Sequence, residues 1–204
     1  MSNAIRVATD VGGTFTDIVV FVPPAGEAPG RLLTAKVDTT PPDFERGVMA
    51  ALTKAGVVAS DLAFFVHGST VGINALTERK GARVGLVTTR GFRDVLEIGR
   101  GNRPDLFNFR FAKPEPFVPR RLRAEITERL DRTGTALVPP SLDELPATLA
   151  TFREEQVEAI AVSLLHAYAN PAHERAVVAE IERLWPGVPV VASHAISGQW
   201  REFE

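Results

Sequence analysis

The sequence predicts an α/β fold in which a mixed sheet opens with an antiparallel meander and carries helices on its faces. Three short apolar runs, 5–10, 15–22 and 31–37, are separated by glycine and proline turns, a pattern typical of consecutive antiparallel strands. Farther along, helical periodicity alternates with short apolar strands, which is typical of parallel strands joined by crossover helices. The 204 residues suffice for one large domain or two small ones.

The elements after the meander are predicted from the spacing of their apolar residues and from the proline and glycine residues at their ends. Helices are expected over 43–56, 71–79, 141–154 and 171–184. Val71, Ala75 and Leu76 should pack the second of these helices on the sheet. Strands are expected over 62–66, 82–88, 124–130, 158–165 and 188–192. Four prolines and several aromatic residues fall within 104–119, so we expect a long proline- and arginine-rich connection over about 100–123 that could contain a short hairpin.

Composition excludes several classes of protein. The 23 basic and 25 acidic residues give a formal net charge of −2, which does not favour a nucleic-acid partner. Cysteine is absent, so no disulfide, thiolate metal site or cysteine nucleophile is available. No apolar stretch is long enough to span a membrane and the N-terminus has no signal core. We therefore expect a cytoplasmic protein without a membrane or nucleic-acid partner.

The sharpest motif is the segment Asp10–Asp17, which joins the first two predicted strands. Gly12 and Gly13 would let backbone N–H groups approach a phosphate without interference from a Cβ atom. Thr14 and Thr16 add hydroxyl donors. A hairpin whose glycines only form the turn is the simpler alternative.

The acidic residues that flank the turn favour phosphate binding over that alternative. Asp10, at the end of the first strand, could hold Mg²⁺ through water, because this ion favours carboxylate oxygens and retains part of its water shell. Asp17 closes the motif on the second strand. A strand rather than a helix follows the glycines and no Gly-Lys-Ser/Thr sequence is present, so the motif is neither a P-loop nor a dinucleotide fingerprint.

The hairpin resembles the first phosphate motif of the actin-like ATPase superfamily, whose ribonuclease H-like fold uses it to bind the β- and γ-phosphates of ATP. Four further blocks resemble the hydantoinase A and 5-oxoprolinase family, and also the corresponding subunit of acetone and acetophenone carboxylases. In order along the chain, these blocks are 67–82, 85–100, 161–174, and 193–196 together with 201–202. Together with the hairpin they cover most of the sequence.

The resemblance implies an actin-like ATPase half-domain that takes part in ATP-dependent hydrolysis of a cyclic amide, a hydantoin or 5-oxoproline, through a phosphorylated intermediate. ATP and Mg²⁺ would be the cofactors, with Asp10 as the metal-side carboxylate. Gly12, Gly13 and Thr14 would form the phosphate cradle, with Thr16 and Asp17 as its support. The remaining implied site residues are His67 and Arg100 as catalytic groups, and Thr70 and Asn74 along the substrate cleft.

The resemblance also implies that 1–204 is the N-terminal region of a longer protein. The residues from Trp200 onward look like the start of a helix without a stop signal, which suggests a fragment. The second phosphate loop and the adenosine site would then lie beyond Glu204, on a further domain or a partner subunit. Three residues depart from the family pattern: Ser69 replaces threonine, Gly101 replaces glutamine, and Ala195 stands where an acid is common.

Several assignments stay open from the sequence. The strand ending at Val66 should place His67 at the same edge of the sheet as Asp10, because parallel strands present ligands at their carboxyl ends. His67 could serve catalysis or a structural hydrogen bond, whereas His166 and His173 favour structural roles. For His194, cleft lining and structure are equally consistent, and no histidine pair has the spacing of a zinc site. The arginines of the middle third could bind an anion, but surface ion pairs are the simpler interpretation, with Arg100 as the exception.

Two other functions stay open beside cyclic-amide hydrolysis. The chain could belong to the ATP-using subunit of a ketone carboxylase, or it could be a non-catalytic segment that mediates subunit assembly. The sequence identifies neither the ring or ketone substrate nor the partner subunit.

Overall fold

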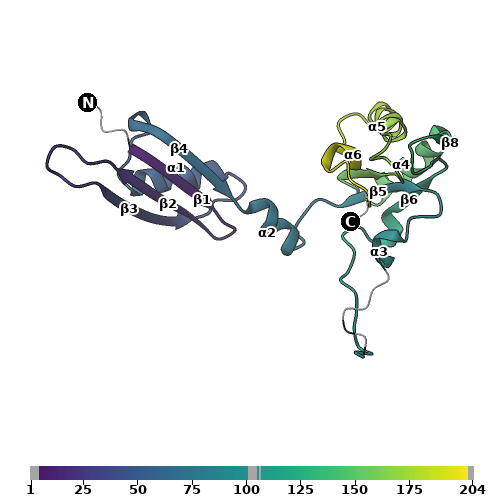
Figure 1. Cartoon of the computed structure of the whole chain (residues 1–204), viewed down its shortest axis with the longest axis horizontal. Helices are drawn as coiled ribbons and strands as arrows, with labels where there is room; N and C mark the ends of the chain where they lie inside the picture. The colour runs from purple at the N-terminus through teal and green to yellow at the C-terminus, as the bar shows by residue number, and fades with distance from the viewer. Residues whose placement is uncertain (1–4, 101–104, 106, 202–204) are drawn as a thin grey trace. The chain divides into compact units, whose positions relative to one another are not determined.

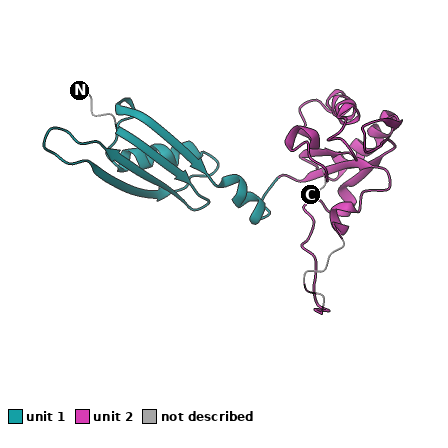
Figure 2. Ribbon diagram, viewed as in Figure 1, with its two compact units in different colours: residues 1–81 teal, residues 82–204 magenta. Residues whose placement is uncertain are grey.

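A computed structural model describes residues 5–100, 105 and 107–201. It divides the chain into two compact units, 1–81 and 82–204, coloured separately in Figure 2. Each unit has its own sheet and its own apolar core, and each is described here by itself. Among the described residues, no helix is long and apolar enough to cross a membrane.

The first unit is built on a four-stranded mixed sheet with the strand order β3-β2-β1-β4 (Figure 1). Strands β1, β2 and β3 are antiparallel neighbours, which confirms the predicted meander, and β4 runs parallel to β1. The strand bounds are Ile5–Val11 for β1, Phe15–Val22 for β2, Arg31–Asp38 for β3 and Leu62–Ser69 for β4.

Helix α1 (Phe44–Lys54) connects β3 to β4 and covers one face of this sheet. The buried core comprises Val7, Ile18 and Val20 from the strands together with Ala51 and Leu52 from the helix. A 3₁₀ turn, η1 (Ala59–Asp61), leads into β4. The alternation of buried and exposed residues along β1 and β2 therefore reflects one covered and one open face of the sheet.

Helix α2 (Val71–Thr77) differs from the sequence expectation. We expected Val71, Ala75 and Leu76 to pack this helix on the sheet, but α2 contains no buried residue, and Leu76 is exposed. Its apolar side chains have helical spacing without a covered face. The strand after α2 does not join the first sheet, and begins a second one.

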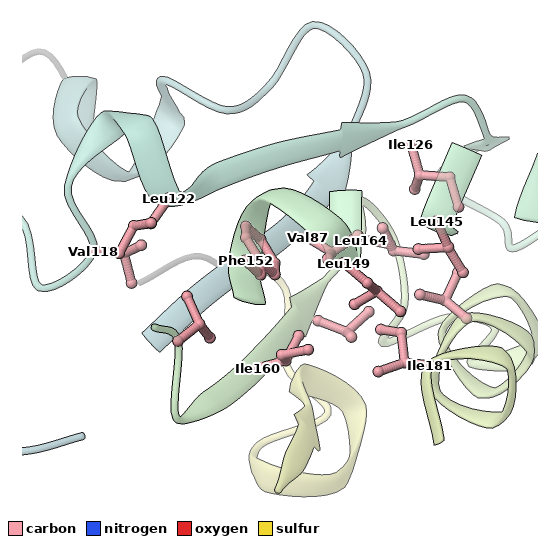
Figure 3. Close-up of a cluster of buried hydrophobic side chains, with 13 residues drawn as sticks. Val87, Val118, Leu122, Ile126, Leu145, Leu149, Phe152, Ile160, Leu164 and Ile181 are labelled. Atoms are coloured by element: carbon pink, nitrogen blue, oxygen red, sulfur yellow. The ribbon is translucent and has the colours of Figure 1, made fainter. Parts of the chain in front are cut away.

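The second unit contains a four-stranded sheet of order β10-β9-β5-β6 in which every neighbouring pair is parallel. Its strands are β5 (Val84–Thr89), β6 (Arg123–Ile126), β9 (Ala159–Ser163) and β10 (Val190–Ala192). Residues of helices α4 (Leu145–Glu154) and α5 (Ala172–Leu184) complete its apolar core, shown in Figure 3. The prediction of parallel strands with crossover helices is confirmed here, in a sheet separate from the meander.

Shorter elements complete the second unit. A small antiparallel pair is formed by β7 (Arg129–Leu130) and β8 (Ala136–Val138), so the single strand expected over 124–130 is split in two. The remaining short helices are α3 (Val95–Ile98), η2 (Arg120–Leu122), η3 (Leu142–Glu144) and α6 (Ser193–Ile196). The described residues of 104–119 contain no helix or strand, and hence no hairpin. The helix expected to start at Trp200 is not seen at Trp200 or Arg201, and its remaining residues, 202–204, lie outside the described residues, as does Gly101.

Gly85 is the point of closest packing in the second core. A Cβ atom at this position of β5 would lie 2.6 Å from the ring of Phe152, which is 1% exposed in α4. We expect Gly85→Ala to lower the free energy of unfolding by about 1–3 kcal/mol, because the buried ring must shift to admit a methyl group. Both tryptophans belong to this unit, so urea unfolding followed by tryptophan fluorescence measures the effect there.

Gly81→Ala is the control for the same exchange at an uncrowded position, because nothing lies within 4 Å of a Cβ atom there, although Gly81 is the last residue of the first unit. Its unfolding midpoint should stay close to that of the unmodified chain. Equal urea unfolding midpoints for the two variants would show that the Phe152 ring can shift without lowering the free energy of unfolding.

Candidate functional site

The predicted phosphate motif forms the turn between β1 and β2. The N–H of Gly12 donates to the carbonyl of Phe15 at 2.9 Å and closes a tight turn. A Cβ atom at Gly12 would lie 3.1 Å from that carbonyl oxygen, and one at Gly13 would lie 3.2 Å from the Asn74 side-chain nitrogen. Both positions are therefore crowded for any larger residue, and the glycine pair is explained by close approach of neighbouring groups.

Thr39, the residue that follows β3, makes hydrogen bonds to the turn. The Thr39 hydroxyl donates to the Gly12 carbonyl at 2.9 Å, and the Thr39 N–H donates to the Thr14 carbonyl at the same distance. Thr16 is 0% exposed, and its hydroxyl lies 3.3 Å from that of Thr39. Because Thr16 faces the core, we assign it to the support of the turn and not to the donors that a phosphate could reach. Thr14 is exposed and keeps that possibility.

Asp10 and Asp17 face each other across the two strands on the open face of the sheet. Two carboxylates in directly opposed positions repel each other, and a cation can relieve that repulsion. Lys36 pairs with Asp17 at 3.2 Å. Within the described part of the chain, Asp10 makes neither an ion pair nor a hydrogen bond.

The donor set suits one class of metal ion. No group of three or more metal-ligating side chains occurs among the described residues. The exposed carboxylate of Asp10 is a ligand type that suits Mg²⁺, which is commonly held by one or two carboxylates, by phosphate oxygens and by its own waters.

The start of α2 borders the glycine turn. The Thr70 N–H donates to the Val11 carbonyl at 3.0 Å, which ties the end of β4 to the end of β1. The Asn74 amide donates to the Thr70 hydroxyl at 3.2 Å and lies against Gly13. Thr70 and Asn74, predicted as cleft residues, thus lie beside the phosphate motif within the first unit.

His67 reaches the expected edge of the sheet but presents its side chain to the opposite face from Asp10. In the parallel register, His67 is paired with Thr9, and Gly68 with Asp10. The Nδ1 atom of His67 lies 2.9 Å from the Thr9 hydroxyl, and the ring stacks on Phe65 at 6.3 Å between centroids. Successive residues of a strand alternate between faces, so a shared edge did not imply a shared face.

Arg100 belongs to the second unit, where it follows α3. Several neighbouring arginines form ion pairs, as the simpler interpretation predicted: Arg90 with Glu144 at 2.9 Å, Arg120 with Asp94 at 2.8 Å, and Arg121 with Glu155 at 3.2 Å. Hydrogen bonding to Arg120 lowers the pKa of Asp94. These pairs explain much of the arginine cluster without an anionic ligand.

Two buried carboxylates in the second unit were not predicted as anchors. Glu128 accepts from the Thr89 hydroxyl and lies 2.7 Å from Nδ1 of His173, which confirms the structural role expected for this histidine. Glu174 in α5 lies 2.6 Å from Nδ1 of His194. The partners lie 20 to 45 residues apart, so no local pattern could reveal them.

The chain belongs to a family defined by the hydantoinase/oxoprolinase N-terminal region, whose model matches residues 6–184. It is 32% identical to the caprolactamase subunit alpha of Pseudomonas jessenii, covering 97% of this chain and 29% of that protein. It is 33% identical to the acetophenone carboxylase gamma subunit of Aromatoleum aromaticum, covering 99% of this chain and 29% of that protein.

Solved structures agree with this assignment. A nucleotide-free structure of the ATP-dependent acetone carboxylase matches with a TM-score of 0.81 and 26% identity, over 98% of this chain and 30% of that one. The α/β fold with a mixed sheet and antiparallel meander is thereby confirmed. The chain spans about 30% of the length of these relatives, and 16% of the length of the 5-oxoprolinase 1 of Arabidopsis thaliana.

Proposed function

We propose that this chain supplies the first phosphate-binding half of an ATP-dependent enzyme that opens a cyclic amide. The observation that carries the proposal is the hairpin itself. A Cβ atom at either glycine would lie closer to a neighbouring atom than ordinary van der Waals contact. Among the described residues of the motif, Asp10 carries the only exposed carboxylate without a partner. The relatives support ATP use, since two of them are named as ATP-dependent enzymes.

The residues of the hairpin have separate tasks in this proposal. Gly12 would shape the turn, since its N–H is donated to Phe15 within it, and the lack of a Cβ atom at Gly13 would let the backbone approach the phosphates. Asp10 would hold Mg²⁺ through water. Thr14 would add a hydroxyl donor, while Thr16 and Asp17 would keep the two strands in register. Such an arrangement orients a phosphoryl group and offsets its charge, which is most of what a protein contributes to phosphoryl transfer.

ATP bound there would supply a phosphoryl group that activates the amide oxygen and would leave as ADP. Water would then add to the amide carbon, the C–N bond would break with the nitrogen taking a proton, and a second water would release the phosphoryl group as inorganic phosphate. Thr70 and Asn74 lie beside the turn and would limit where that amide can sit. His67 points to the other face of the sheet, so we assign it no proton transfer at the hairpin. Its bond to Thr9 would instead position β4 against β1. The adenosine pocket and second phosphate loop would come from sequence outside this chain.

A ketone carboxylase is the second candidate, because relatives of this kind match as well as the caprolactamase does. One experiment separates the two. ADP formation by the complete enzyme is measured with caprolactam, 5-oxoproline and hydantoin, and separately with acetone and acetophenone in bicarbonate. Stimulation by a cyclic amide supports the proposal, stimulation by a ketone only with bicarbonate supports the carboxylase, and no ATP turnover with any of them contradicts both.

A further inference from the structure

The parallel sheet of the second unit has a face that α4 and α5 do not cover. Val87 and Ile160 point into the apolar core beneath those helices (Figure 3). Because side chains alternate along a strand, their neighbours point the other way. On that second face lies a cavity of about 190 Å³.

The floor of the cavity is made by two cross-strand pairs. Leu86 of β5 is opposite Ala161 of β9, and Thr88 is opposite Ser163. One pair is apolar and the other carries two hydroxyl groups. The hydroxyl pair lies at the carboxyl ends of the strands, the edge at which open parallel sheets hold their ligands.

The walls are apolar. Val95 and Leu96 belong to α3, and the other apolar lining residues are Phe92, Phe117, Val118 and Leu165. None of the described residues that line the cavity carries a charged side chain. Within this lining, hydrogen bonding to an occupant therefore falls to the two hydroxyl groups on the floor.

Thr88 provides an independent indication of a ligand. The residue is only 7% exposed, yet its hydroxyl makes no hydrogen bond within the described part of the chain. Every described side-chain nitrogen or oxygen that is fully inaccessible does have a partner. The Thr88 hydroxyl must therefore be reachable, and the cavity that Thr88 lines is the space it reaches. A buried hydroxyl facing an apolar cavity is stabilised when an occupant completes its hydrogen bond.

We propose that this cavity binds a small, neutral, largely apolar molecule with one carbonyl oxygen, which accepts a hydrogen bond from Thr88. An apolar cavity of about 150 Å³ accommodates benzene, so 190 Å³ admits a six- or seven-membered ring with one substituent. A carboxylate is disfavoured, because nothing in the lining would pair with its charge. The site goes beyond the phosphate hairpin, and its occupancy does not require ATP.

Cyclohexanone is a suitable probe, and cyclohexanecarboxylate is its charged counterpart. Methyl NMR signals of Leu86, Val95 and Leu96 should shift saturably with cyclohexanone in the absence of ATP. The carboxylate should bind at least about tenfold more weakly. Thr88→Val keeps the shape and removes the hydroxyl, so it should weaken cyclohexanone binding by about three- to tenfold.

Ala161→Leu places a larger side chain on the floor and should abolish the saturable shifts. Ala147→Leu is the matched control, since Ala147 is exposed on α4, away from the cavity lining. Circular dichroism verifies that each variant is folded. If Ala161→Leu does not fold, the change in cyclohexanone binding of Thr88→Val tests the proposal by itself. Absence of saturable shifts, equal binding of the carboxylate, or unchanged binding in Thr88→Val would each overturn the proposal.

Discussion

Replacing Asp10 with alanine should abolish Mg²⁺-dependent ATP turnover by the complete enzyme while leaving the fold of the first unit intact. The side chain is exposed, lies on the open face of the sheet and has no partner among the described residues, so its loss removes no packing. We expect a fall in turnover of at least about 100-fold, the scale on which loss of one electrostatic contact to the reacting group acts. ADP release measures the rate, and far-ultraviolet circular dichroism measures the fold.

Asp61→Ala is the matched control, because Asp61 is also an exposed aspartate of the first unit but lies in η1, away from the hairpin. It should keep full turnover. Gly13→Val should be as damaging as Asp10→Ala, since a side chain there would meet Asn74 beside the turn. Unchanged Mg²⁺-dependent ATP hydrolysis in the Asp10 variant would remove the hairpin from the proposed site.

The hairpin could be predicted because its signals are local. Alternation with a period of two marks β1 and β2, and the glycine pair between them marks the turn. The same local logic placed His67 at the edge where β1 ends. It did not settle which face the ring occupies, because that depends on the register of β4 against β1, and a shift of one residue reverses every side chain.

The division into two units could not be predicted from pattern. Ile73 and Leu76 give α2 the spacing of a helix that packs on a sheet, yet they are 64% and 59% exposed. The period of the apolar residues shows that a helix has a face that could pack on a sheet. Only the tertiary structure shows whether that face is packed. The strand after α2, β5, pairs with β6 and β9, which come much later in the sequence.

Buried charge was the least predictable feature of the second unit. Acidic residues are seldom buried, so Glu174 in the first turn of a helix suggests only a favourable interaction with the helix dipole. The structure gives it a larger role. One oxygen of its carboxylate accepts from the Leu164 N–H at 2.9 Å and from the Ser193 hydroxyl at 2.7 Å. The other accepts from the His194 N–H at 3.0 Å and lies 2.6 Å from that ring.

This carboxylate therefore ties together α5, the end of β9 and the start of α6. Glu174→Gln keeps the size of the side chain but replaces one acceptor oxygen with an NH₂ group, which would face donors. We expect the free energy of unfolding of the second unit to fall by about 2–4 kcal/mol, because hydrogen bonds to a charged acceptor are lost and a buried donor is left unpaired. Urea unfolding followed by tryptophan fluorescence measures the loss.

Glu180→Gln is the control on the same helix, because Glu180 pairs with Arg183 at 2.6 Å, and the arginine of that pair is exposed. An ion pair of this kind contributes little to stability, so the urea unfolding midpoint of Glu180→Gln should be close to that of the unmodified chain. The difference between the two variants isolates the effect of burial, since charge and side-chain length change identically. If both variants unfold at the same urea concentration, the four contacts of Glu174 do not hold these three segments together.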